Sequence, residues 1–136
     1  MYAVAMVCSK RFKKEERAFA KGLRKLGITV YEPALSVTPR WNDFSEEDKL
    51  AHAAGLTYRH FQKIRKSDAI FVLNKDGYAG VSTNMEIGYA AALDKRIYFF
   101  EEDTDYPRKI LVDGIAKTPK ELVERIKNVA PPDILD

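Results

Sequence analysis

Short runs of uninterrupted apolar residues constrain the fold of this chain more than any other feature of its sequence. Residues 2–8 and 69–73 contain no charged side chain, and residues 97–100 form a third such run directly after Arg96. Strands with one solvated face alternate apolar and polar residues, whereas the strands of a parallel sheet are buried on both faces and read as continuous apolar runs. The sequence therefore predicts a parallel sheet that helices cover on both faces.

Helical segments are predicted between these strands. In residues 13–26, Phe19, Leu23 and Leu26 recur at i, i+4 and i+7 as a buried stripe, and Gly27 ends the helix. Three further helices are expected, over 45–66 with Gly55 as a candidate break, from Ser82 or Thr83 to 93, and over 119–129. The remaining strands are expected at 28–31, 96–100 and 110–112.

The alternation of strands and helices predicts one α/β domain over residues 1–136. Parallel strands joined by right-handed crossovers give a flavodoxin-like, doubly wound five-stranded sheet with the strand order 2-1-3-4-5. Ligands of such sheets bind where the winding reverses, at the carboxyl ends of strands 1 and 3. The loops Ser9–Lys14 and Asn74–Ser82 are therefore expected to border the ligand site.

Composition excludes several other classes of protein. With 46% hydrophobic and 32% charged residues in 136, the chain is neither disordered nor collagen-like. No apolar run approaches the roughly 18 residues of a membrane span. The basic residues near the start follow the apolar stretch, which is the reverse of a secretory signal, and a single cysteine forms no internal disulfide. We therefore expect a cytoplasmic protein without a membrane partner.

The net charge of +3 is unevenly distributed, with the basic excess in residues 1–66. The cluster Arg59, Lys63, Arg65 and Lys66 is compatible with nucleic acid or with solvated helix faces, and because no known nucleic-acid module matches, we do not expect nucleic acid as a partner. The topology brings only Lys10 and Arg11 near the crevice. They are candidates to hold a phosphate, or are solvated residues at a helix start.

A glycine-containing loop leads from the third strand into the next helix. Gly77 and Gly80 let the backbone approach a ligand, and Ser82 and the N–H groups of the first helical turn suit an anion or sugar hydroxyls. Asp76 is a candidate partner for a ribose hydroxyl, or a turn residue.

The sequence allows two roles for Glu86. Thr83 and Glu86 have the spacing of a capping box, in which the glutamate reaches back to the Thr83 N–H. Alternatively, Glu86 lies in the first helical turn with its side chain near the crevice.

The stretch from Asp68 to Tyr98 resembles the nucleoside 2-deoxyribosyltransferase-like superfamily, which includes nucleoside 5′-monophosphate N-glycosidases. The resemblance rests on Asp-Ala-Ile-Phe-Val-Leu, Gly-Tyr-Ala-Gly and Met-Glu-Ile-Gly-Tyr-Ala between two buried strands. It implies cleavage or transfer at the N-glycosidic bond of a nucleoside or its 5′-monophosphate, no metal or organic cofactor, and a homo-oligomer that completes its site across subunits. It implies Glu86 as the nucleophile, and the N-terminus of the helix would keep that carboxylate ionised. The expected substrate-binding residues are Ser9, Lys10, Arg11, Asp76, Gly80, Ser82, Thr83 and Asn84.

Two positions depart from the family pattern. Gly80 stands six residues before the glutamate, where the family carries an aspartate, and His60 stands eight residues before Asp68, at a second family aspartate. Both carboxylates serve the sugar hydroxyl and the departing base, so their absence favours hydrolysis over base exchange. It also leaves open a nucleotide-binding sensor that does not turn over. His60 is either an ordinary helix-face histidine or a proton donor to the base, and Trp41 either stacks on a base or packs at the sheet edge.

Overall fold

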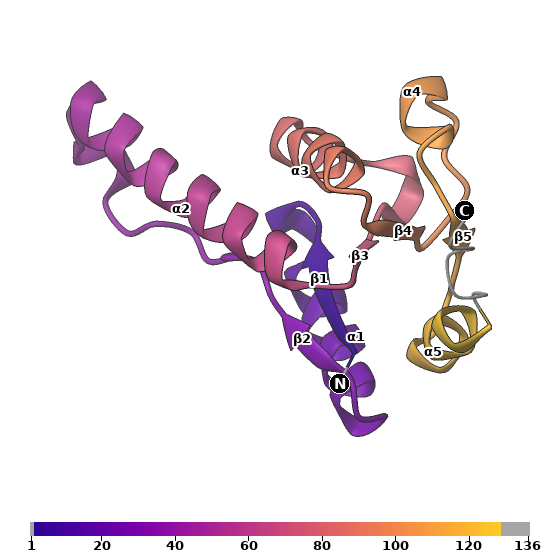
Figure 1. The fold of residues 1–136 in the computed structure, drawn as a ribbon. Coiled ribbons are helices and arrows are strands. Elements are labelled where there is room, and N and C mark those ends of the chain that lie inside the picture. The colour runs from indigo at the N-terminus through magenta and orange to yellow at the C-terminus, as the bar shows by residue number, and fades with distance from the viewer. Residues whose placement is uncertain (1, 129–136) are drawn as a thin grey trace.

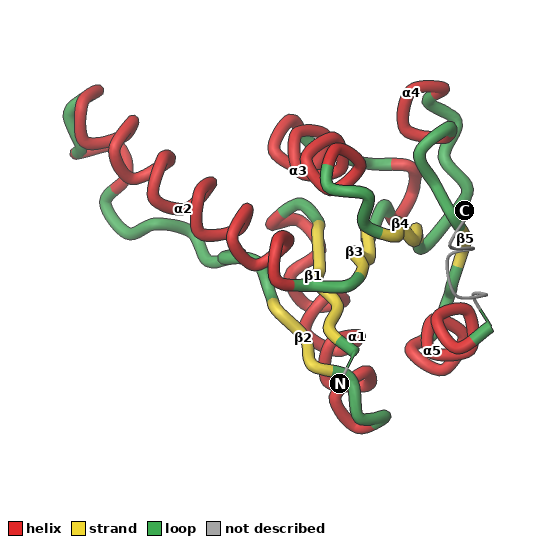
Figure 2. Tube along the Cα trace, viewed as in Figure 1, coloured by secondary structure: helices red, strands yellow, loops and turns green. Residues whose placement is uncertain are grey.

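A computed structural model describes residues 2–128 as a five-stranded parallel sheet flanked by helices (Figure 1; strands yellow and helices red in Figure 2). The strand order β2-β1-β3-β4-β5 confirms the predicted order, and every strand pair is parallel. The strands are β1 (Ala3–Val7), β2 (Thr29–Tyr31), β3 (Ala69–Val72), β4 (Arg96–Phe99) and β5 (Gly114–Ile115).

The helices form one layer on each face of the sheet. The helices α1 (Lys13–Lys25) and α5 (Pro119–Lys127) pack together on one face, and α2 (Glu46–Lys66) and α3 (Val81–Ala92) pack on the other. The short helix α4 (Tyr106–Lys109) follows β4. Three 3-10 turns complete the structure at Lys10–Phe12, Trp41–Asp43 and Lys75–Gly77.

The two cores explain why the strands lack polar residues. Val4 and Met6 of β1 face the α1/α5 side, whereas Ala5 and Val7 face the α2/α3 side, and all four are fully buried. On the α1/α5 side, the rings of Phe19 and Phe71 stack with centroids 4.2 Å apart. Burial of both faces is therefore the physical basis of the uninterrupted apolar runs.

Two predicted details of the elements are wrong. Leu26 is 48% exposed, because α1 ends at Lys25 and Gly27 turns the chain away with φ at +86°. Residues 110–112 are not a strand, since α4 precedes them and the chain reaches β4 only at Asp113, whose N–H donates to the Ile97 carbonyl. The last helix ends at Lys127, and Val129 lies outside the described residues.

The outer half of α2 projects beyond the sheet (Figure 1). The helix continues unbroken through Gly55, Leu50 is 71% exposed, and His60 and Ile64 are the only buried residues of α2. Only the last two turns of α2 therefore contribute to the core. Within residues 2–128, no helix has the length and apolar character needed to cross a membrane.

Candidate active site

A cavity of about 590 Å³ opens at the carboxyl end of β1, beside the start of α3. The topology predicts a crevice at this end of the sheet, between β1 and β3, but among the described residues the lining on the β3 side begins only at Gly80. The walls of the cavity come from four segments: Cys8–Lys10 after β1, the loop after β2, the inner side of α2 from His52 to Phe61, and the first turns of α3 from Gly80 to Glu86. The cavity is therefore bounded by elements that are distant in the sequence.

The first turn of α3 presents unused backbone donors to the cavity. Gly80 is the N-cap, extended at φ −79° and ψ 179°, and no side chain caps the helix. The Asn84 N–H donates to the Gly80 carbonyl at 3.0 Å, so the N–H groups of residues 81–83 precede the first intrahelical bond. Ser82 lies in this turn and lines the cavity.

The predicted capping box is wrong. Because Gly80 allows the chain to enter the helix at Val81, Thr83 lies inside the first turn and is buried rather than capping it. Glu86 consequently lies in the second turn, where the helix dipole is weak. The helix N-terminus therefore lies too far from Glu86 to act on its charge as the sequence predicts.

Glu86 instead meets a histidine from α2. The residue is 9% exposed and lines the cavity, and its Oε2 atom lies 2.8 Å from Nδ1 of His60. Oε2 is buried, and among the described residues no partner forms a hydrogen bond of good geometry with it, so the short contact with His60 is its one close polar approach there. The other ring nitrogen of His60, Nε2, lies 3.1 Å from the Met6 carbonyl oxygen.

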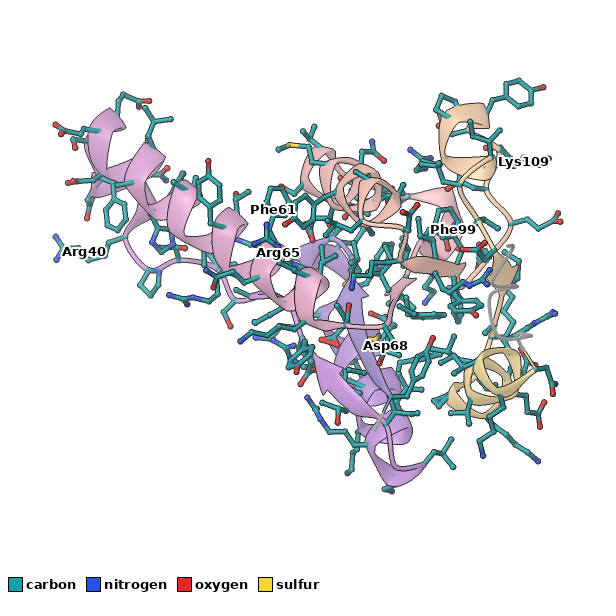
Figure 3. The ribbon with its side chains drawn as sticks, in the orientation of Figure 1. Arg40, Phe61, Arg65, Asp68, Phe99 and Lys109 are labelled. Atoms are coloured by element: carbon teal, nitrogen blue, oxygen red, sulfur yellow. The ribbon has the colours of Figure 1, made fainter. Side chains whose placement is uncertain are left out.

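The outer wall of the cavity is apolar and aromatic. The loop after β2 supplies Pro33, Leu35 and Val37, and α2 supplies Leu56 and Phe61. Phe61 is held by stacking on Tyr89 of α3, with ring centroids 4.2 Å apart, and Figure 3 shows it on the side of α2 that faces α3. This wall therefore offers flat apolar surfaces to a ligand.

Trp41 anchors the loop after β2 against α2. Its ring lies 5.9 Å from that of His52, and Thr38 Oγ1 is 3.0 Å from His52 Nε2. Trp41 also lines the cavity, so packing and ligand stacking are compatible roles for it. The sequence predicts residues 34–44 as a loop and Trp41 as a residue that stacks on a base or packs at the sheet edge, but the loop shows no periodicity that would reveal its packing on α2.

The thiol at the end of β1 is inert. Burial, together with the nearby carboxylates of Glu16 and Glu86, raises the pKa of Cys8 from 9.0 to about 12. Cys8 lines the cavity but stays protonated at neutral pH, so it is no nucleophile. Among the described residues, no group of three or more His, Cys, Asp or Glu is arranged to hold a metal ion.

The model of the nucleoside 2-deoxyribosyltransferase family matches residues 3–124. The chain belongs to this family. A comparison with curated proteins found no match.

Solved structures share the fold of this deoxyribosyltransferase family member. A 2-deoxyribosyltransferase from the psychrotolerant bacterium Bacillus psychrosaccharolyticus aligns over 94% of this chain and 92% of that chain, with 17% identity and a TM-score of 0.66. A conserved protein from Enterococcus faecalis V583 aligns over 93% and 98%, with 13% identity and a TM-score of 0.65. A 2-desoxiribosyltransferase from Leishmania mexicana aligns over 76% and 67%, with 20% identity and a TM-score of 0.52.

The structure of this family member brings six of the nine predicted site residues to the cavity. They come from the two loops that the topology singled out and from the helix that follows the second loop. These six are Ser9, Lys10, Gly80, Ser82, Thr83 and Glu86.

The other three predicted residues do not line the cavity. The Arg11 guanidinium lies 3.6 Å from the centroid of the Tyr78 ring. Asp76 is exposed in a turn with φ at +57°, and Asn84 Oδ1 accepts a hydrogen bond from Arg108 at 3.2 Å. Each of the three thus has a structural setting apart from the crevice.

Proposed function

We propose that this family member cleaves or transfers at the N-glycosidic bond of a nucleoside or nucleoside 5′-monophosphate, with the Glu86 carboxylate as nucleophile. The observation that carries this proposal is a buried carboxylate in the wall of a largely apolar cavity. A carboxylate oxygen of Glu86 bonds to C1′ of the sugar, the C1′–N bond breaks, and its electron pair leaves with the base. Water or a second base then attacks C1′ and releases the carboxylate, which gives net retention.

The two ends of the cavity suit the two ends of such a substrate. The apolar wall around Trp41, Leu56 and Phe61 suits a planar base. Among the other lining residues, Lys10, Ser82 and the N–H groups at the start of α3, which precede the first intrahelical hydrogen bond, suit a 5′-hydroxyl or 5′-phosphate. Glu86 lines the same cavity.

A panel assay tests this function. The protein is incubated with nucleosides and their 5′-monophosphates, with and without an acceptor base, and free base and exchanged nucleoside are separated chromatographically. We expect release of free base without acceptor, and Glu86→Gln should lower the rate by at least ~10³-fold. Release that persists in Glu86→Gln contradicts the assignment of the nucleophile.

The same panel separates the other functions. Saturable nucleotide binding without any release of base would favour the sensor without turnover. Tight and strongly salt-dependent binding to DNA or RNA would favour the nucleic-acid-binding protein. Of the basic cluster, Lys63 donates to the Glu32 carbonyl and Arg65 donates to Tyr89 Oη, so two of its four cations have partners inside the protein.

We infer further that the protein is a cytoplasmic homo-oligomer in which a second copy covers the outer half of α2. Large apolar side chains are exposed there and on the adjoining start of α3. They are Leu50, Tyr58, Val81 and Met85. Light scattering after gel filtration should give a mass above 15.5 kDa, which Leu50→Glu with Tyr58→Glu should reduce to that of the monomer. A monomeric wild-type protein would contradict this inference.

A further inference from the structure

The Met6 carbonyl of β1 has no N–H partner from the neighbouring edge strand β2. The Thr29 N–H donates to the Tyr2 carbonyl, and the register continues through Ala5 opposite Tyr31. Four residues further along both strands, the Met6 carbonyl would receive the N–H of residue 33. Residue 33 is a proline and has no N–H.

His60 fills the vacant donor position. Its Nε2 atom lies 3.1 Å from the Met6 carbonyl oxygen. Because a carbonyl only accepts hydrogen bonds, Nε2 must carry a hydrogen in this contact. This hydrogen bond to Met6 therefore fixes the orientation of the His60 ring and leaves Nδ1 close to Glu86.

A proton on Nδ1, in addition to the one on Nε2, would make the short contact between the His60 ring and Glu86 favourable. Without it, a nitrogen lone pair would lie 2.8 Å from a carboxylate oxygen, which is repulsive. With it on Nδ1, a +1 ring faces a −1 carboxylate in a site where both residues are only 9% exposed. No acidic or basic side chain other than Glu86 lies within ion-pair distance of the ring in the described part of the chain.

We propose that His60 is a positioning residue that, as an imidazolium anchored to the Met6 carbonyl, holds the buried Oε2 of Glu86 and leaves Oε1 for the substrate. This proposal rests on the proposed function. When Oε1 bonds to C1′ and the C1′–N electron pair leaves with the base, the ring keeps its proton and faces the ester carbonyl oxygen. When the C1′–Oε1 bond breaks in the second step, the ring charge stabilises the returning carboxylate. The departing base takes its proton from solvent water, and the water that attacks C1′ loses a proton to solvent, so neither proton passes through His60.

Two conservative variants separate this role from a purely structural one. In His60→Gln, the side-chain amide can occupy the position of Nε2 and donate to the Met6 carbonyl, but no donor faces Glu86. In His60→Asn, the amide can occupy the position of Nδ1 and donate to Glu86, but the Met6 carbonyl loses its donor. We expect kcat to fall ~10²-fold in His60→Gln with KM little changed, and to fall less in His60→Asn. A His60→Gln variant with wild-type kcat would overturn the proposal, as would a lower kcat in His60→Asn than in His60→Gln when both are folded.

Nuclear magnetic resonance tests the ion pair without reference to activity. The chain has only two histidines, so the ring nitrogens of His60 and His52 are readily assigned. At neutral pH, we expect both His60 nitrogens to be protonated in the wild type, and Nδ1 to lose its proton in Glu86→Gln. His52, which contacts Thr38, should not change and serves as the internal control. A neutral His60 ring in the wild type overturns the proposal, whereas a protein that shows the ion pair but releases no base refutes only the proposed function.

Discussion

A methyl group added at Gly22 offers a direct test of how closely α1 and α5 pack. Gly22 lies in the interior of α1, and a Cβ atom there would lie 2.6 Å from Cγ and 3.2 Å from Cβ of Pro119. Carbon atoms in contact prefer separations of about 3.5–4.0 Å, so one helix must move by nearly 1 Å. The proline ring cannot rotate away as a flexible side chain would, and Pro119 is fixed at the first turn of α5.

Two opposing terms decide the effect of Gly22→Ala on the free energy of unfolding. Replacing glycine by alanine inside a helix contributes about 1 kcal/mol of stability. Overpacking a core contact costs about 1–3 kcal/mol, and a 2.6 Å approach to a rigid ring belongs at the upper end of that range. We therefore expect a net loss of about 1–2 kcal/mol.

Matched controls are Gly55→Ala in α2 and Gly88→Ala in α3. A Cβ at either position meets nothing within 4 Å, so only the helix propensity acts and stability should rise by about 0.5–1 kcal/mol. Urea denaturation followed by circular dichroism measures all three variants at one protein concentration. If Gly22→Ala proves as stabilising as the controls, the close contact between α1 and Pro119 is not present in the protein.

Further predictions concern buried titratable groups. Burial, reinforced by Glu32, raises the pKa of Glu16 from 4.5 to about 7, so the folded state retains a proton that the unfolded chain releases. Stability should thus fall as pH rises from about 4.5 to 7, and urea titrations of Glu16→Gln should show a shallower slope. Although burial opposes it, the hydrogen bonds from Arg108 lower the pKa of Asp103 below 3.8. Asp103→Asn should cost about 2 kcal/mol at pH 7 and progressively less below pH 3.8, and a constant cost across this range would contradict the assignment. Because the pKa of Cys8 is about 12, iodoacetamide should label the native thiol far more slowly than the urea-unfolded one, as mass spectrometry can measure.

Local sequence patterns were sufficient to predict the sheet but not everything that surrounds it. Strands buried on both faces have an unambiguous apolar signature, and chirality rules then select the strand order, as β1 and β3 illustrate. The pattern of α2 is misleading, because its apolar residues at the outer turns, such as Leu50, are not covered by this chain. The two-residue strand β5 carries too little sequence to be located.

The candidate site was predictable where it depends on topology and not where it depends on tertiary contacts. The loops at the carboxyl ends of β1 and β3 follow from strand order, so Ser9, Lys10 and Ser82 were predicted to border the crevice, and they line it. The pairing of Glu86 with His60 joins α3 to α2 across 26 positions of sequence, and no local spacing encodes it. It depends on how α2 crosses the end of β1.

The projecting half of α2 and the loop that packs on it border the cavity but contribute little to the core of the sheet. Surface substitutions generally change stability by less than about 0.5 kcal/mol, and most residues from 46 to 59 are exposed. The sheet that carries folding and the α3 turn that carries Glu86 can therefore stay constant while residues 36–59 diversify. On the proposed function, grafting residues 36–59 between relatives of the same fold is expected to change base preference while the sheet stays intact.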